Sequence, residues 1–193
     1  ALDIYKELDI QSTQNKIYTE VLFIDSYSRT TLEANLIEYK NGEYISYRVL
    51  DEEDYVSTKR NKGISESKTN FIVTIDDDCI PSENFLIGHF NKLKEFQDKK
   101  VLICGKVKYS EELCEESNYF RFREERHRRF DIKYYKDRKL NFHNIVAMNM
   151  SFSKDIVLHN NLKFNERYNA YGFEDIQYDI DAISKNFEII TCS

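Results

Sequence analysis

The chain has 193 residues, of which 41% are hydrophobic and 32% charged, and its formal net charge is -6. This composition is typical of one soluble globular domain and excludes a disordered chain. The acidic balance argues against a nucleic-acid binder, and no apolar run reaches the roughly 20 residues that a membrane-spanning helix needs.

Strand patterns alternate with helical patterns through the first 110 residues. The sequence predicts, in chain order, a helix to about residue 10, a strand 20–25, a helix 30–39, a strand 44–50, a helix 54–67, a strand from 71, a helix 83–96 and a strand 101–109. Strands that alternate with helices of this length favour an α/β fold with a mainly parallel sheet and helices on both faces.

The second half begins with a long charged segment, residues 115–139. Its part 121–139 holds nine basic and four acidic residues, a local charge of +5. Such a segment could clamp a phosphate-bearing substrate or an anionic acceptor; the alternative is a solvated helix with many ion pairs. A strand 145–152, a loop, a helix 174–185 and a strand 187–192 are expected after it.

Both ends of the chain look cut. A helical pattern starts at Ala1 with no N-cap before it, and the last strand stops without a turn. We therefore expect a fragment of a larger domain that lacks a strand before Ala1. The four cysteines have no CxxC spacing, so reduced thiols are expected rather than a zinc site.

The strand from Phe71 ends in Asp76, Asp77 and Asp78, followed by Pro81. Carboxylates at the carboxyl end of a buried strand lie where open α/β sheets bind ligands. Hard oxygen ligands suit Mg²⁺ or Mn²⁺ bound together with substrate phosphates, so the motif indicates a metal–phosphate site. The alternative is an acidic turn that caps the following helix.

Four motifs together resemble the family 2 glycosyltransferases, which have the GT-A nucleotide-sugar fold. In chain order they are Val21 to Ser28 with Asp25, Lys59-Arg60-Asn61-Lys62-Gly63, Ile75-Asp76-Asp77-Asp78, and Met148-Asn149-Met150-Ser151-Phe152 with Tyr171-Gly172-Phe173-Glu174-Asp175. The resemblance implies one GT-A domain over residues 1–193, with a nucleotide-binding half, 1–110, and an acceptor and catalytic half, 111–193.

The resemblance also implies roles on the donor side. Asp78 would ligate the metal that bridges the two phosphates, and Asp76 would lie near the ribose and the metal. Asp77 belongs to the same donor-binding set, although the strand pleat points it to the opposite face. Asp25 would accept a hydrogen bond from the base, unless it only caps a turn. Arg60 would contact the base or the diphosphate, unless it is a surface helix residue.

On the acceptor side, a general base must take the proton of the attacking hydroxyl. Asp175 matches the base of the family, and Glu174 is the second candidate or a ligand of acceptor hydroxyls; both acids also favour a helix N-terminus. Gly172 fits a close approach of backbone to substrate. Asn149 would hydrogen-bond near the donor sugar, or would hold a loop.

The implied activity is an inverting, metal-dependent hexosyl transfer from a nucleotide sugar, UDP-linked, to a glycan, lipid-linked or protein acceptor in the cytoplasm or at the inner face of the membrane. A role in bacterial polysaccharide or protein-glycan assembly follows by analogy. Two departures are Gln177, where many members have an acid, and the lack of tryptophan. The alternatives are a non-catalytic sugar-nucleotide or carbohydrate-binding module and a metal-dependent nucleotidyl- or phosphotransferase.

Overall fold

The structure is a computed structural model that describes residues 1–26, 42–52, 55–128, 146–168 and 172–192. The predicted helix 30–39 and Tyr171 lie outside these residues. The helices are α1 (Leu2–Asn15), α3 (Val56–Glu66), α4 (Phe85–Glu95), α5 (Glu111–Glu116), α6 (Asn118–Arg128), α8 (Lys154–His159) and α9 (Glu174–Ser184). The strands are β1 (Thr19–Asp25), β2 (Ile45–Asp51), β3 (Phe71–Ile75), β4 (Val101–Cys104), β5 (Asn149–Ser153) and β6 (Glu188–Thr191).

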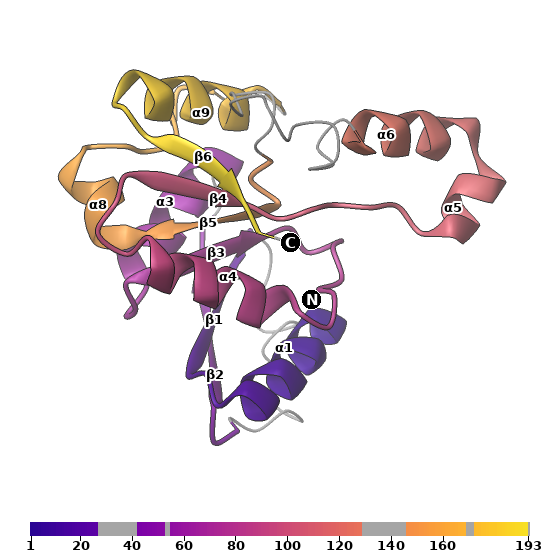
Figure 1. Cartoon of the computed structure of the whole chain (residues 1–193), viewed down its shortest axis with the longest axis horizontal. Helices are drawn as coiled ribbons and strands as arrows, with labels where there is room; N and C mark the ends of the chain where they lie inside the picture. Colours follow the sequence, from indigo (N-terminus) through magenta and orange to yellow (C-terminus); the bar gives the residue numbers. More distant parts are fainter. Residues whose placement is uncertain (27–41, 53–54, 129–145, 169–171, 193) are drawn as a thin grey trace.

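The described strands form two sheets (Figure 1). Strands β1 and β2 pair in parallel, and the other sheet has the order β3-β5-β4-β6. Strand β5 is antiparallel to both β3 and β4, whereas β6 is parallel to β4. Because β3 and β4 both oppose β5, they run in the same direction. The predicted mainly parallel α/β arrangement is therefore confirmed, with one reversed strand that the sequence pattern did not reveal.

Helices cover both faces of the larger sheet, and β4 shows this directly. Its Leu102 and Cys104 pack in a cluster with α9, whereas Val101 and Ile103 pack with Leu93 of α4. This alternation follows from the two-residue period of a strand, which sends successive side chains to opposite faces. All four residues of β4 are buried, which explains their continuous apolar run in the sequence.

Strands β1 and β3 form no hydrogen-bonded pair with each other among the described residues. They line a groove of about 400 Å³ instead. Val21 of β1 and Val73 of β3 contribute to its walls, together with Phe85 and Leu86 of α4. Each of these two strands thus has one edge that faces an apolar groove rather than another strand.

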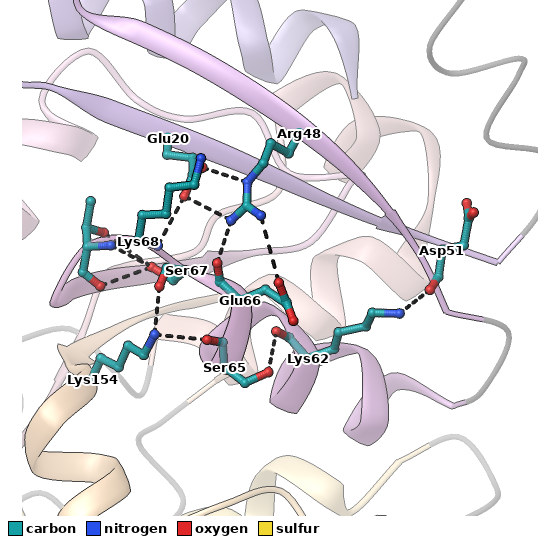
Figure 2. A network of polar contacts seen from close by, with 10 residues as sticks. Glu20, Arg48, Asp51, Lys62, Ser65, Glu66, Ser67, Lys68 and Lys154 are labelled. Atoms are coloured by element: carbon teal, nitrogen blue, oxygen red, sulfur yellow. Dashed lines mark hydrogen bonds and ion pairs between the residues drawn. The ribbon is translucent and has the colours of Figure 1, made fainter.

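A polar network ties α3 to the strands β1 and β2 and to the start of α8 (Figure 2). Arg48 of β2 donates through Nε to Glu20 of β1 at 2.7 Å. The Nζ of Lys154, at the start of α8, donates to the carbonyls of Ser65 and Ser67 at 3.0 and 2.6 Å. These carbonyls at the end of α3 have no partner within the helix, so the lysine stabilises the helix end.

Two segments differ from their prediction. The expected strand 101–109 is shorter in the structure and ends at Cys104; the Gly105 amide makes one more bond to β5, to the Asn149 carbonyl at 2.9 Å. The described part of segment 115–139 is divided between α5 and α6, which extend away from the body of the molecule as an arm (Figure 1). No described helix is long and apolar enough to cross a membrane.

Candidate active site

The site lies at one end of the strands of the larger sheet, where β3 ends and the reversed strand β5 begins. Ile75, the last residue of β3, is paired with Asn149, the first residue of β5. Asp76 follows Ile75 directly, so the backbone of the aspartate motif begins beside that of Asn149 at this end of the sheet. The antiparallel direction of β5 places their backbones at the same end of the sheet, whereas their side chains contact different helices: Asp76 contacts Arg60 of α3, and Asn149 contacts His89 of α4.

Asp76 is the most buried of the three consecutive aspartates, since Asp77 and Asp78 are exposed. Burial raises the pKa of the Asp76 carboxyl, and the charges of Asp78 and Asp77 act in the same direction, while Arg60 opposes the shift. Within the described residues no group of three His, Cys, Asp or Glu side chains is placed to hold a metal ion. In proteins Mg²⁺ is often bound through one or two carboxylates, with water and phosphates as its other ligands, so the carboxylate chemistry of Asp76 and Asp78 suits an ion of this kind.

Arg60 of α3 joins Asp76 to the predicted catalytic pair. Its guanidinium lies 3.3 Å from Asp76 Oδ1 and 2.9 Å from Glu174 Oε1, and its side chain is only 14% exposed. The guanidinium also lies over the ring of Phe164, 5.3 Å from the centroid. Arg60 is thus a partly buried cation between two carboxylates. The alternative expectation, that it is a surface helix residue, is wrong.

Asn61, the next residue of the same motif, holds Phe164 in place. Its Nδ2 donates to the Phe164 carbonyl at 2.8 Å, and its Oδ1 accepts from the Phe164 amide at 2.9 Å. The asparagine therefore fixes the loop that presents the ring beneath Arg60. The contact of Asn61 with Phe164 was not predicted, because the two residues are 103 positions apart in the sequence.

The two acids at the start of α9 differ in their surroundings. Glu174 is 9% exposed and is bound to Arg60 through Oε1. Asp175 is less buried, and its Oδ1 accepts from the Ile176 amide at 2.8 Å. Glu174 is thus held in an ion pair through Oε1, while its buried Oε2 has no hydrogen-bond partner within the described residues; Asp175 is the more accessible of the two acids.

The backbone before these acids is left-handed at two successive residues. Gly172 has φ of 100° and Phe173 has φ of 70°. Apart from its chain neighbours, no atom of the described residues lies within 4 Å of the position that a Cβ on Gly172 would take, so its positive φ is the feature that favours glycine there. Phe173 adopts a conformation that costs an L-residue about 1–2 kcal/mol, while its ring is 69% exposed.

Asn149 is held by two partners. Its Nδ2 donates to the Lys106 carbonyl at 3.0 Å, and its Oδ1 lies 2.8 Å from Nε2 of His89. A Cβ on Gly105 would come within 2.2 Å of this amide oxygen, so glycine is required for the close approach. His89 was not predicted as a site residue, since a lone histidine in a helix gives no pattern.

Asp25 ends β1 opposite Asp51 of β2, and its carbonyl accepts from the Glu52 amide at 2.8 Å. Lys59 of α3 contacts the hydroxyl of Ser26, so the end of β1 lies beside the helix that carries Arg60. Asp78 is in contact with the Cys79 thiol at 3.6 Å. The structure places neither Asp25 nor Asp78 in contact with Arg60, and their roles stay predictions.

A further acid was not assigned by the sequence. Asp179 of α9 is 1% exposed, and both of its carboxylate oxygens lack a hydrogen-bond partner within the described residues. Burial, together with the nearby charge of Asp175, raises its pKa to about 9. Asp179 is therefore protonated and neutral at pH 7.

Comparisons with known proteins agree with this arrangement. The sequence profile described as glycosyl transferase family 2 matches residues 10–159. The crystal structure of S. aureus TarS 1-349 is similar with a TM-score of 0.64 and 13% identity, over 98% of this chain and 53% of that one. A second crystal structure of S. aureus TarS has the same TM-score and identity, over 98% of this chain and 32% of that one.

These structural similarities concern the fold, because the identity is low. The chain spans about half the length of the first of these structures and about a third of the second. No curated protein gives a match to the sequence.

Proposed function

Because this chain belongs to glycosyl transferase family 2 and has the GT-A fold, we propose that it transfers a sugar from a UDP-linked donor to a hydroxyl of a glycan, lipid-linked or protein acceptor, with inversion at the anomeric carbon. The observation that supports the proposal is the Arg60 bridge. It connects the aspartate motif of the nucleotide-binding half, 1–110, with the acids of the acceptor half, 111–193.

On the donor side, Asp78 and Asp76 would hold Mn²⁺ or Mg²⁺. The ion would supply Lewis-acid stabilisation of the negative charge that develops on the leaving β-phosphate. Arg60 supplies a fixed positive charge beside Asp76, which keeps that carboxylate oriented. Asp25 at the end of β1 would bind the base.

On the acceptor side, Asp175 is the proposed general base. The acceptor oxygen attacks the anomeric carbon, the bond from this carbon to the phosphate oxygen breaks, and the hydroxyl proton passes to Asp175. Glu174 is the less suitable base because its Oε1 is 2.9 Å from the Arg60 guanidinium.

The testing experiment is calorimetric titration of the protein with UDP, with and without Mn²⁺, on the wild type and Asp78→Ala. We expect binding that needs Mn²⁺ and is lost in the variant. Asp98→Ala is the matched control, since this exposed aspartate lies just before the start of β4, at the opposite end of the strands from Asp76.

A second assay follows release of the sugar from a panel of UDP-sugars. Binding of UDP without any turnover would favour the non-catalytic module. Phosphate transfer without sugar transfer would favour the phosphotransferase. No binding of UDP, and none of other nucleotides, by folded protein would contradict the proposal.

A further inference from the structure

His89 lies between two elements next to the candidate site, α4 and β5. It belongs to α4, its side chain is 1% exposed, and both ring nitrogens contact residues of β5. Nδ1 is 2.7 Å from the Ser151 hydroxyl, and Nε2 is 2.8 Å from Asn149 Oδ1. A buried histidine with both nitrogens engaged has a fixed ring orientation.

The tautomer of His89 follows from a backbone carbonyl at the far end of this network. The Lys106 carbonyl can only accept, so the Asn149 atom that contacts it is the amide nitrogen Nδ2. The other amide atom, Oδ1, therefore faces His89 and needs a donor. His89 must carry its proton on Nε2, and Ser151 must donate its hydroxyl proton to Nδ1.

This network leaves Asn149 with one free amide N–H of fixed direction at the end of the sheet. One N–H of its amide is used by Lys106, and the other has no partner within the described residues. Asn149 is opposite Ile75, next to Asp76, and is partly exposed. Without His89 the amide would be held only through Nδ2 and the Lys106 carbonyl, so its plane could turn about this single contact and its free N–H would lose its fixed direction.

We propose that His89 is a positioning residue that fixes the Asn149 amide so that its free N–H donates to an oxygen of the nucleotide-sugar donor. The inference rests on the proposed function and extends it to a residue outside the sequence motifs. His89 itself does not touch the donor. Its effect passes through Asn149, which gives the proposal a specific test.

The test is a double-mutant cycle on the affinity for UDP, UDP-glucose and UDP-N-acetylglucosamine in Mn²⁺. We expect His89→Phe, which keeps a ring of similar size, to weaken binding about three- to tenfold, the value of one lost hydrogen bond. The same change in an Asn149→Ala background should have no further effect. A loss with UDP itself assigns the oxygen to the UDP part of the donor; a loss with the UDP-sugars alone assigns it to the sugar.

Controls separate a positioning role from a structural one. His159→Phe makes the same change at an exposed residue of α8 and should leave affinity unchanged. Should His89→Phe fail to fold, Ser151→Ala replaces it, since loss of this hydroxyl frees the ring; its effect should also vanish in the Asn149→Ala background. Wild-type affinity in the variant that folds, or an effect that persists without Asn149, overturns the proposal.

Nuclear magnetic resonance tests the network without any ligand. The ¹⁵N shifts of the His89 ring distinguish its tautomers, and we expect the proton on Nε2. A proton on Nδ1 overturns the inference. If the tautomer is as expected and wild-type protein binds no nucleotide, the network stands and the proposed function is what fails.

Discussion

Arg60 and Glu174, separated by 114 positions in the sequence, form an ion pair of 2.9 Å between α3 and the first residue of α9. Both side chains are mostly buried, at 14% and 11% exposure. The pair fixes the start of the helix that carries Asp175 to the helix beside the aspartate motif. Its geometry therefore bears on both stability and catalysis.

We expect Arg60→Met to lower the free energy of unfolding by about 2 kcal/mol, because Glu174 would be left as a buried carboxylate without its cation. The double variant Arg60→Met/Glu174→Met should recover much of this loss, since it removes both charges. Urea unfolding monitored by circular dichroism measures the difference. Arg167→Met, at an exposed arginine, is the matched control. Equal stabilities of the single and double variants would show that the buried charge is not the cause.

Asp175→Asn should lower the rate of sugar transfer by at least about a hundredfold, because an amide cannot take the acceptor proton. Affinity for UDP with Mn²⁺ should be unchanged, since Asp175 is not among the proposed donor ligands. The measurement combines steady-state kinetics with calorimetry on the same preparation. If the variant keeps its turnover, another group is the general base. If the variant loses UDP binding, Asp175 belongs to the donor site.

The buried centre of the sheet was the easiest part to predict, because a fully buried strand has an uninterrupted apolar run between polar boundaries. Val101 to Cys104 is an example, with every side chain buried. The direction of β5 was not predictable, because the same residues fit a parallel or an antiparallel neighbour. The arm could not be divided correctly either: Ser110 caps α5 by accepting from the Leu113 amide at 3.3 Å, a short-range signal within a generally charged segment.

Asp179→Asn should stabilise the protein more at pH 8 than at pH 5. The carboxyl pKa is about 9 in the folded chain, against an ordinary value of 3.8. Between these values the folded state holds one proton more than the unfolded state, so this carboxyl makes stability fall as pH rises. An amide removes that dependence, and we expect the gain to be at least about 1 kcal/mol larger at pH 8.

Urea unfolding of the Asp179 variant and the wild type at both pH values measures this gain. Asp98→Asn, at an exposed aspartate, should show the same stability difference from wild type at both pH values. An equal effect of Asp179→Asn at pH 5 and pH 8 would mean that the buried carboxyl keeps an ordinary pKa.

Phe173→Asn should raise the free energy of unfolding by about 1 kcal/mol. Asparagine tolerates the left-handed conformation at φ of 70° better than phenylalanine does, and it is a preferred residue at the N-cap, which Phe173 occupies for α9. Thermal unfolding measures the change. Tyr18→Asn replaces another exposed aromatic ring, at a residue without positive φ, and should give no gain. A loss of stability in Phe173→Asn would show that the exposed ring makes stabilising contacts.

The sequence motifs located the site but not its internal connections. Arg60, Asp76 and Glu174 were each assigned from a separate motif, and the structure shows that one guanidinium joins them. Asn61 and His89 act through partners that only the folded chain brings near, Phe164 and Asn149. Asp179 has no motif at all, because burial of a carboxyl depends on what packs over it.

The reversed direction of β5 also makes β4 and β5 a single hairpin, in which Ile103 is paired with Ser151 and Cys104 with Met150. Residues 105–148 connect the two strands, and the described part of this connection holds α5 and α6; it begins after Cys104 and ends before Asn149, at the end of the sheet where Asp76 lies. The entropy of closing a loop grows only slowly with its length, by about 0.6 kcal/mol for each doubling. The arm is therefore a segment that can be lengthened, shortened or exchanged at small thermodynamic cost while the sheet and its aspartates stay in register.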